Sequence, residues 1–156
     1  MTVIPYKISI PGRLADEFAR GFKSISVERL AHGRPIAIFL WHADSEGLKV
    51  QSVMHDVAER FEVGALEFSR ITGTVSEVSE FDLPGEFGVG LKASKLVLST
   101  DGVTVESGIV LQGNRGNEMV LVAGAQPYTF AIKSPSVVEE FDPEYPLSKY
   151  SREPID

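Results

Sequence analysis

The chain has 156 residues, 43% hydrophobic and 24% charged, which is the composition of a single globular domain with a core of its own. It contains no cysteine, which excludes disulfides, thiolate metal sites and cysteine nucleophiles and fits a reducing cytoplasm. The net charge of −7 argues against nucleic-acid binding, and no apolar run approaches the roughly 18 residues that a membrane span needs.

The first thirty residues predict a strand followed by a short helix. Residues 3–10 alternate between apolar and polar side chains, which predicts a half-buried strand that ends at a Pro-Gly pair. Leu14, Phe18 and Phe22 then recur at helical spacing, with charged residues on the opposite face. This spacing predicts a short amphipathic helix, and residues 26–33 are expected to add a further helical turn.

A second strand and a second helix are expected next. Residues 36–41 are continuously apolar, as in a strand that is covered on both faces. From Val50 on, apolar residues recur at i, i+3, i+4, i+7, i+8 and i+11, and the positions between them are polar. The pattern favours a helix over about 46–62. A strand is the alternative, because residues 48–54 also alternate and three valines lower the helix propensity.

The strongest local signal is Asp101-Gly102 between two β-prone runs, the pattern of a two-residue hairpin turn. This turn pairs Leu98 with Val105 and Leu96 with Ser107, and side chains directly opposite each other share a face. The apolar face is expected to carry Leu96, Leu98, Val103, Val105, Ile109 and Leu111. The opposite, wet face is expected to carry Lys95, Ser99, Thr104 and Glu106.

These elements predict an α+β domain. A mainly antiparallel, curled sheet, either a sandwich or a partial barrel, is expected to take most of the chain from residue 62 on. One or two amphipathic helices from the N-terminal third would cover one of its faces. Residues 1–136 are expected to form the globular domain. Residues 137–156 form an acidic, proline-rich tail that is partly docked through its aromatic residues.

The stretch with the highest concentration of potentially catalytic or ion-binding side chains runs from His42 to Glu46, at the predicted strand-to-helix junction. A histidine, two carboxylates and a hydroxyl within five residues suit acid–base chemistry or a divalent ion. The simpler interpretation is favoured: Asp44 or Ser45 caps the helix, and Glu46 complements its dipole.

A second histidine, His55, lies four residues before Glu59 on the polar face of the same predicted helix. Two ligands do not make a metal site, so an exposed pair is favoured. The catalytic candidates are therefore His42, Asp44 and His55, and neither a cofactor nor a metal ion is predicted. The glycine-rich stretch 85–90 lacks the order of a dinucleotide fingerprint and the lysine of a P-loop, so it is interpreted as a flexible turn.

Composition and the missing motifs favour a non-catalytic protein-binding module with an acidic surface, such as an inhibitor, an immunity-type protein or an adaptor. The tail over 137–156 alone holds six acidic and two basic side chains, so the expected partner is a basic protein. The alternative is a small-molecule-binding protein or an enzyme with its site at the His42–Glu46 junction. A homo-oligomer held by strand addition at an exposed edge is a third hypothesis.

Overall fold

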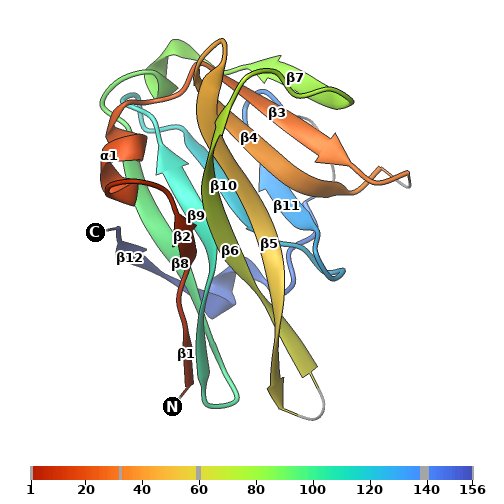
Figure 1. Cartoon of the computed structure of the whole chain (residues 1–156). Helices are drawn as coiled ribbons and strands as arrows, with labels where there is room; N and C mark the ends of the chain where they lie inside the picture. The colour runs from red at the N-terminus through yellow and green to blue at the C-terminus, as the bar shows by residue number, and fades with distance from the viewer. Residues whose placement is uncertain (1, 32, 59–60, 138–140, 156) are drawn as a thin grey trace.

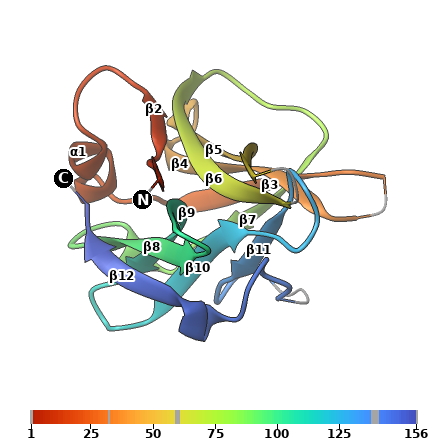
Figure 2. The same cartoon turned by 90° about the horizontal axis from the view of Figure 1, so that it is seen from below.

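The protein is described by a computed structural model in which residues 2–31, 33–58, 61–137 and 141–155 are placed. Two β-sheets pack face to face, as the views of Figures 1 and 2 show. The strands are β1 (Thr2–Ile4), β2 (Lys7–Ser9), β3 (Ser24–Arg29), β4 (Pro35–Ala43), β5 (Glu46–Ala58), β6 (Phe61–Thr72), β7 (Val78–Asp82), β8 (Lys92–Thr100), β9 (Val103–Gln112), β10 (Glu118–Ala123), β11 (Phe130–Lys133) and β12 (Tyr150–Pro154). The helical elements are α1 (Leu14–Ala19) and two 3₁₀ turns, η1 (Gly85–Phe87) and η2 (Leu147–Lys149).

Each sheet has six strands. Sheet A has the order β11-β10-β9-β8-β12, and β1 pairs with β9 outside this path. Sheet B has the order β2-β6-β5-β4-β3-β7. Most neighbours are antiparallel, but β1 on β9 and β2 on β6 are parallel pairs.

The expected α+β class is wrong. The structure is 58% strand and 8% helical, and its described residues hold one short α-helix. That helix lies where the spacing of Leu14 and Phe18 predicted one, and both side chains are buried. Residues 24–29 form the strand β3 instead of a helical turn. No helix in the part of the chain that is placed is long and apolar enough to cross a bilayer.

The helix predicted over 46–62 is also wrong, because this stretch forms β5 and the start of β6. β5 pairs along its length with β6, with Leu48 opposite Arg70 and Val50 opposite Phe68. Leu48 and Val50 are fully buried in the core. This stretch fits both the helical and the strand periodicity. It forms a strand because β6, a long partner, satisfies its backbone hydrogen-bonding groups. Residues 59–60 lie outside the described part of the chain.

The hairpin at Asp101-Gly102 is confirmed. Both residues have positive φ, 47° and 78°, and Leu98 lies opposite Val105. The register then shifts, because Val97 pairs with Glu106 while Leu96 pairs with Gly108. Ser107 is therefore an extra residue on β9, a β-bulge that changes which side chains share a face.

The predicted single apolar face is wrong beyond this bulge. Val103 and Val105 lie in a cluster on the outer side of sheet A, whereas Ile109 and Leu111 lie between the two sheets. The predicted wet face is only partly wet, because Ser99 is exposed but Lys95 and Glu106 form a largely buried ion pair of 2.7 Å. One inserted residue exchanges the two sides of a strand.

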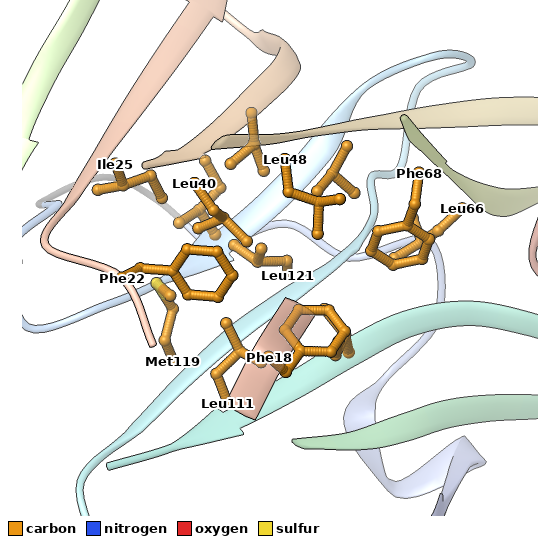
Figure 3. Packing of buried hydrophobic residues seen from close by; sticks show 14 of the residues in the cluster. Phe18, Phe22, Ile25, Leu40, Leu48, Leu66, Phe68, Leu111, Met119 and Leu121 are labelled. Carbon is orange, nitrogen blue, oxygen red and sulfur yellow. The ribbon is translucent and has the colours of Figure 1, made fainter. Parts of the chain in front are cut away.

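The main core fills the space between the two sheets (Figure 3), and α1 lies at one side of the sandwich (Figure 2). Phe18 and Phe22 come from the helix region, Leu111 and Leu121 from sheet A, and Phe68 from sheet B. Phe18 makes edge-to-face contacts with Phe22 and Phe68 at centroid distances of 5.9 and 6.0 Å. Such contacts fix the position of the helix against both sheets.

The outer side of sheet A is also apolar, and the C-terminal segment lies over it. Tyr150 is buried in this second cluster, and Phe141 and Tyr145 pack against it. Backbone hydrogen bonds attach the segment, from Glu144 to the carbonyl of Ala123 and then along β12, which pairs with β8. Residues 141–155 are thus a structured layer of the domain.

The N-terminal strands join the two sheets. β1 pairs with β9 of sheet A, and β2 pairs with β6 of sheet B. Between them the buried Tyr6 donates its hydroxyl to the carbonyl of Gly108, and its backbone N–H donates to Glu106 at 2.7 Å. Lys95 lies over the Tyr6 ring, 5.4 Å from its centroid. This linkage closes one side of the sandwich.

Candidate functional site

The carboxylate of Glu17 is the centre of a buried polar cluster between α1 and sheet B. Its Oε2 lies 2.8 Å from Nε2 of His42, and its Oε1 accepts a hydrogen bond of 2.9 Å from Arg70. The side chains of Glu17 and His42 are only 6% and 4% exposed. Arg20 adds a second cation 3.7 Å from Glu17. Burying a carboxylate without partners costs free energy, and the charged partners of Glu17 offset that cost.

Both ring nitrogens of His42 are engaged. Nδ1 lies 2.7 Å from the carbonyl oxygen of Gly21, which can only accept, and Nε2 faces Glu17. The ring also stacks on Phe22 at 4.6 Å between centroids. Each ring nitrogen therefore lies within hydrogen-bond distance of a protein oxygen. In this arrangement His42 positions α1 and offers no nitrogen to a substrate or a metal ion.

The rim of the cluster is a set of compensated charges. Arg20 donates to Glu46 at 2.7 Å, and this hydrogen bond and charge lower the pKa of Glu46. Arg70 lies 3.8 Å from the same carboxylate. Lys23 donates to Asp44, and the hydrogen bond and the charge hold the pKa of Asp44 below its usual range. Each of these carboxylates already has a cation.

The structure brings some of the sequence candidates together and separates others. His42 reaches the same cluster as Glu46, and Asp44 lies at the rim through Lys23. His55 lies nine residues beyond Glu46 on β5, about 30 Å away at the rise of a strand. Residues 44–45 form a turn between two strands, so no helix is capped there. Glu59, the proposed neighbour of His55, lies outside the described residues.

Sequence reasoning missed Glu17 and Arg70, the two residues that complete the cluster. Helical spacing placed Glu17 on the polar face of α1, and Arg70 comes from β6, 53 positions away. The only sequence feature that pointed to the cluster was the charge of Glu17. On a helix of six residues, Glu17 lies directly beside the core residue Phe18, so its carboxylate needs a polar partner on the sheet that the helix covers.

A second candidate is an open cleft of about 330 Å³ between two loops. It is lined by Pro84, Gly85, Glu86, Asn114 and Arg115. Glu86 is buried, whereas Arg115 is exposed at the tip of the β9–β10 loop. The cleft includes part of the glycine-rich stretch 85–90, which we interpreted from the sequence as a flexible turn.

A third candidate is an acidic strip along the border of sheet B, which we call the acidic edge and define as Glu28, Glu77, Glu80 and Asp82. β7 is the last strand of the sheet, and it pairs only with β3. Glu77, Glu80 and Asp82 are exposed. Among the described side chains, no Lys, Arg or His lies within ion-pair distance of these four carboxylates.

Within the placed residues, no three His, Asp or Glu side chains gather closely enough to hold a metal ion. The chain was also compared with protein families, with curated proteins and with solved structures. No family, no curated protein and no solved structure matches it.

Proposed function

We propose that the protein is a non-catalytic protein-binding module whose acidic edge receives a basic partner. The observation that carries the proposal is the acidic edge, where exposed carboxylates with no cationic partner among the described side chains follow the border of a sheet. Other acidic groups, such as Glu46 and Glu118, are already paired with arginines of the same chain. Unpaired charge of one sign on one border attracts a partner of opposite charge.

The border also offers backbone groups. The side of β7 that faces away from β3 has no partner strand in the described structure, so alternate N–H and C=O groups point outward. An extended segment of a partner can add to such an edge by main-chain hydrogen bonds, while its lysines and arginines meet Glu80 and Asp82. Charge and an open strand thus occur at the same place.

The alternative, a ligand or catalytic site at the His42–Glu46 junction, has less support. Both nitrogens of His42 are hydrogen-bonded, and Asp44 and Glu46 are each bound to a cation. A ligand would have to displace these contacts. The absence of cysteine supports a reducing, cytoplasmic location for the proposed module.

The test uses a fluorescent ten-residue oligolysine as the probe and a variant that removes three carboxylates of the acidic edge, Glu77→Gln/Glu80→Gln/Asp82→Asn. We expect the Kd of the wild-type protein to rise with salt and the variant to bind about tenfold more weakly, because each exposed contact contributes about 0.5 kcal/mol. Fluorescence anisotropy at several salt concentrations measures both effects.

The matched control is Asp56→Asn/Glu62→Gln/Glu153→Gln, which removes the same three charges at exposed positions elsewhere. It should retain most of the affinity. If both triple variants weaken binding equally, association follows the net charge alone and the acidic edge has no special role.

A further inference from the structure

The cleft between residues 84–86 and 114–115, which we call the loop cleft, is built from two loops that hold each other. The backbone N–H of Asn114 donates to the carbonyl of Glu86 at 3.1 Å, and the side chain of Asn114 donates to the carbonyl of Val89 at 3.2 Å. η1, the turn that carries Glu86, lies near the top of Figure 1. The walls are thus fixed by hydrogen bonds before any ligand arrives, which lowers the entropic cost of binding.

Glu86 lines the loop cleft, and its carboxylate packs against the opposite loop. Glu86 is 8% exposed, and its two oxygens accept hydrogen bonds from the backbone and the side-chain amide of Asn117 at 3.2 and 2.8 Å. Gly113 is what admits it, because a Cβ at that position would lie 2.4 Å from Oε1 of Glu86. The side chain is therefore held in one position by the opposite loop.

Within the residues that the structure places, the carboxylate of Glu86 has no counterion. Both of its donors are neutral groups of Asn117, and no Lys, Arg or His in the described part of the chain lies within ion-pair distance. Buried carboxylates normally have a cationic partner, because each oxygen retains lone pairs that neutral donors only partly satisfy. A cation from outside would complete this site.

Arg115 provides a positive charge at the cleft, opposite the negative charge of Glu86. Its guanidinium is exposed at the rim, on the loop opposite η1, and among the described residues it has no carboxylate within ion-pair distance. A guanidinium presents paired N–H groups that match a carboxylate. A ligand with only a positive charge would meet repulsion from Arg115, and one with only a negative charge would meet repulsion from Glu86.

We propose that the loop cleft binds a small zwitterion of the α-amino-acid type, with its ammonium group on Glu86 and its carboxylate on Arg115. The volume of about 330 Å³ lies at the lower end of the range of about 300–1,000 Å³ for small-ligand sites. The open side of the cleft leaves space for the ligand's side chain. This site is independent of the acidic edge, so either proposal can fail without the other.

The experiment titrates the twenty free amino acids, each at millimolar concentration, into the ¹⁵N-labelled full chain and follows the amide signals of Asn114 and Asn117. For the tightest ligand, its N-acetyl derivative removes the cation and its C-terminal amide removes the anion. We expect each derivative to bind at least tenfold more weakly than the free amino acid.

Two variants test which residue binds the ammonium group of the ligand and which binds its carboxylate. Glu86→Gln should abolish the preference for the free amino group, and Arg115→Gln should abolish the preference for the free carboxylate. Arg29→Gln, on the β3–β4 hairpin, is the control and should change neither. Arg115 is exposed, so its variant decides the matter even if Glu86→Gln unfolds.

Three outcomes would overturn the proposal. One is that no amino acid shifts the signals of Asn114 and Asn117. Another is that a derivative binds as tightly as the parent. The third is that Arg115→Gln leaves the preference for the free carboxylate unchanged.

Discussion

Glu144 is a carboxylic acid that the fold places where its charge is poorly solvated. It lies on the C-terminal segment, and its Oε1 accepts a long hydrogen bond of 3.4 Å from the backbone of Gly64. Burial raises the pKa of Glu144 from 4.5 to about 7, and this hydrogen bond opposes the rise only in part. The same carboxylate contributes, after burial, to the raised pKa of Tyr150, which is itself buried in the second cluster.

This shift predicts a pH dependence with a definite sign. The folded protein binds the proton of Glu144 more tightly than the unfolded chain, so this group adds stability as the pH falls from about 7 towards 4.5. Above pH 7 the buried charge costs free energy. Glu144→Gln should therefore stabilise the protein at pH 8 by about 1 to 2 kcal/mol, less than the full shift implies because the side chain is only half-buried.

Urea unfolding at several pH values, followed by the fluorescence of the buried Trp41, measures this effect. The difference between wild type and variant should disappear below about pH 4.5. A variant that is equally stabilised at pH 4 and pH 8 would show that the gain comes from packing instead of charge.

Only some of the residues in the cluster around His42 could be identified from the sequence. His42, Asp44 and Glu46 are close in the chain, so their types and spacing were enough to single them out. Glu17 and Arg70 reach the same place through the packing of a helix on a distant strand, and one sequence does not record that proximity. The use of both His42 nitrogens follows from the position of a carbonyl oxygen, which no residue type reveals.

Among the elements, α1 has the weakest support of its own. It has six residues, no side-chain cap at its start and no basic residue in its last turn. Helices this short are not stable alone, so tertiary contacts have to hold it. Phe18 supplies the apolar contact, and Glu17 supplies the polar one through His42 and Arg70.

Removing the polar contact should therefore cost as much as breaking a buried ion pair. We expect Glu17→Ala to lower the free energy of unfolding by about 3 kcal/mol, because His42 and Arg70 both lose their acceptor. Asp16→Ala is the control, since Asp16 is an exposed carboxylate on the same helix and should change stability by less than about 0.5 kcal/mol. Equal effects of the two substitutions would mean that helix propensity, and not the cluster, determines the loss.

The elements differ in how far the sequence predicted them. Asp101-Gly102 permitted only one turn geometry, so the hairpin and its first pairs followed from local residues. β5 had two competing periodicities, and the choice depended on β6 as its partner. The bulge at Ser107 was invisible, because an extra residue in a ladder appears only when the two strands are aligned.

For the whole molecule, small residues line a place where the two sheets approach each other closely. A Cβ added to Gly64 of β6 would lie 2.6 Å from the Cβ of Ala123 in β10 and 3.1 Å from the hydroxyl of Ser52. Ser107 donates its hydroxyl across the gap to the carbonyl of Gly64 at 2.6 Å. The distance between the sheets at this point is set by the absence of side-chain volume.

Gly64→Ala should consequently destabilise the protein by about 1 to 3 kcal/mol through overpacking, and Ala123→Gly in the same chain should recover part of that loss. A double-mutant cycle, measured by urea unfolding, gives the coupling between the two positions. Gly85→Ala is the control, because nothing lies within 4 Å of its added Cβ. Additive effects at residues 64 and 123 would show that the sheets can move apart without resistance.

The parallel pairing of Thr2–Ile4 with Val103–Val105 has a consequence for synthesis on the ribosome. β1 leaves the ribosome about a hundred residues before its partner β9, and β8 gains its outer neighbour only when Tyr150–Pro154 appears. Until then the nascent polypeptide exposes unsatisfied strand borders. Such long-range closure favours slow, late folding and a period in which a chaperone is useful.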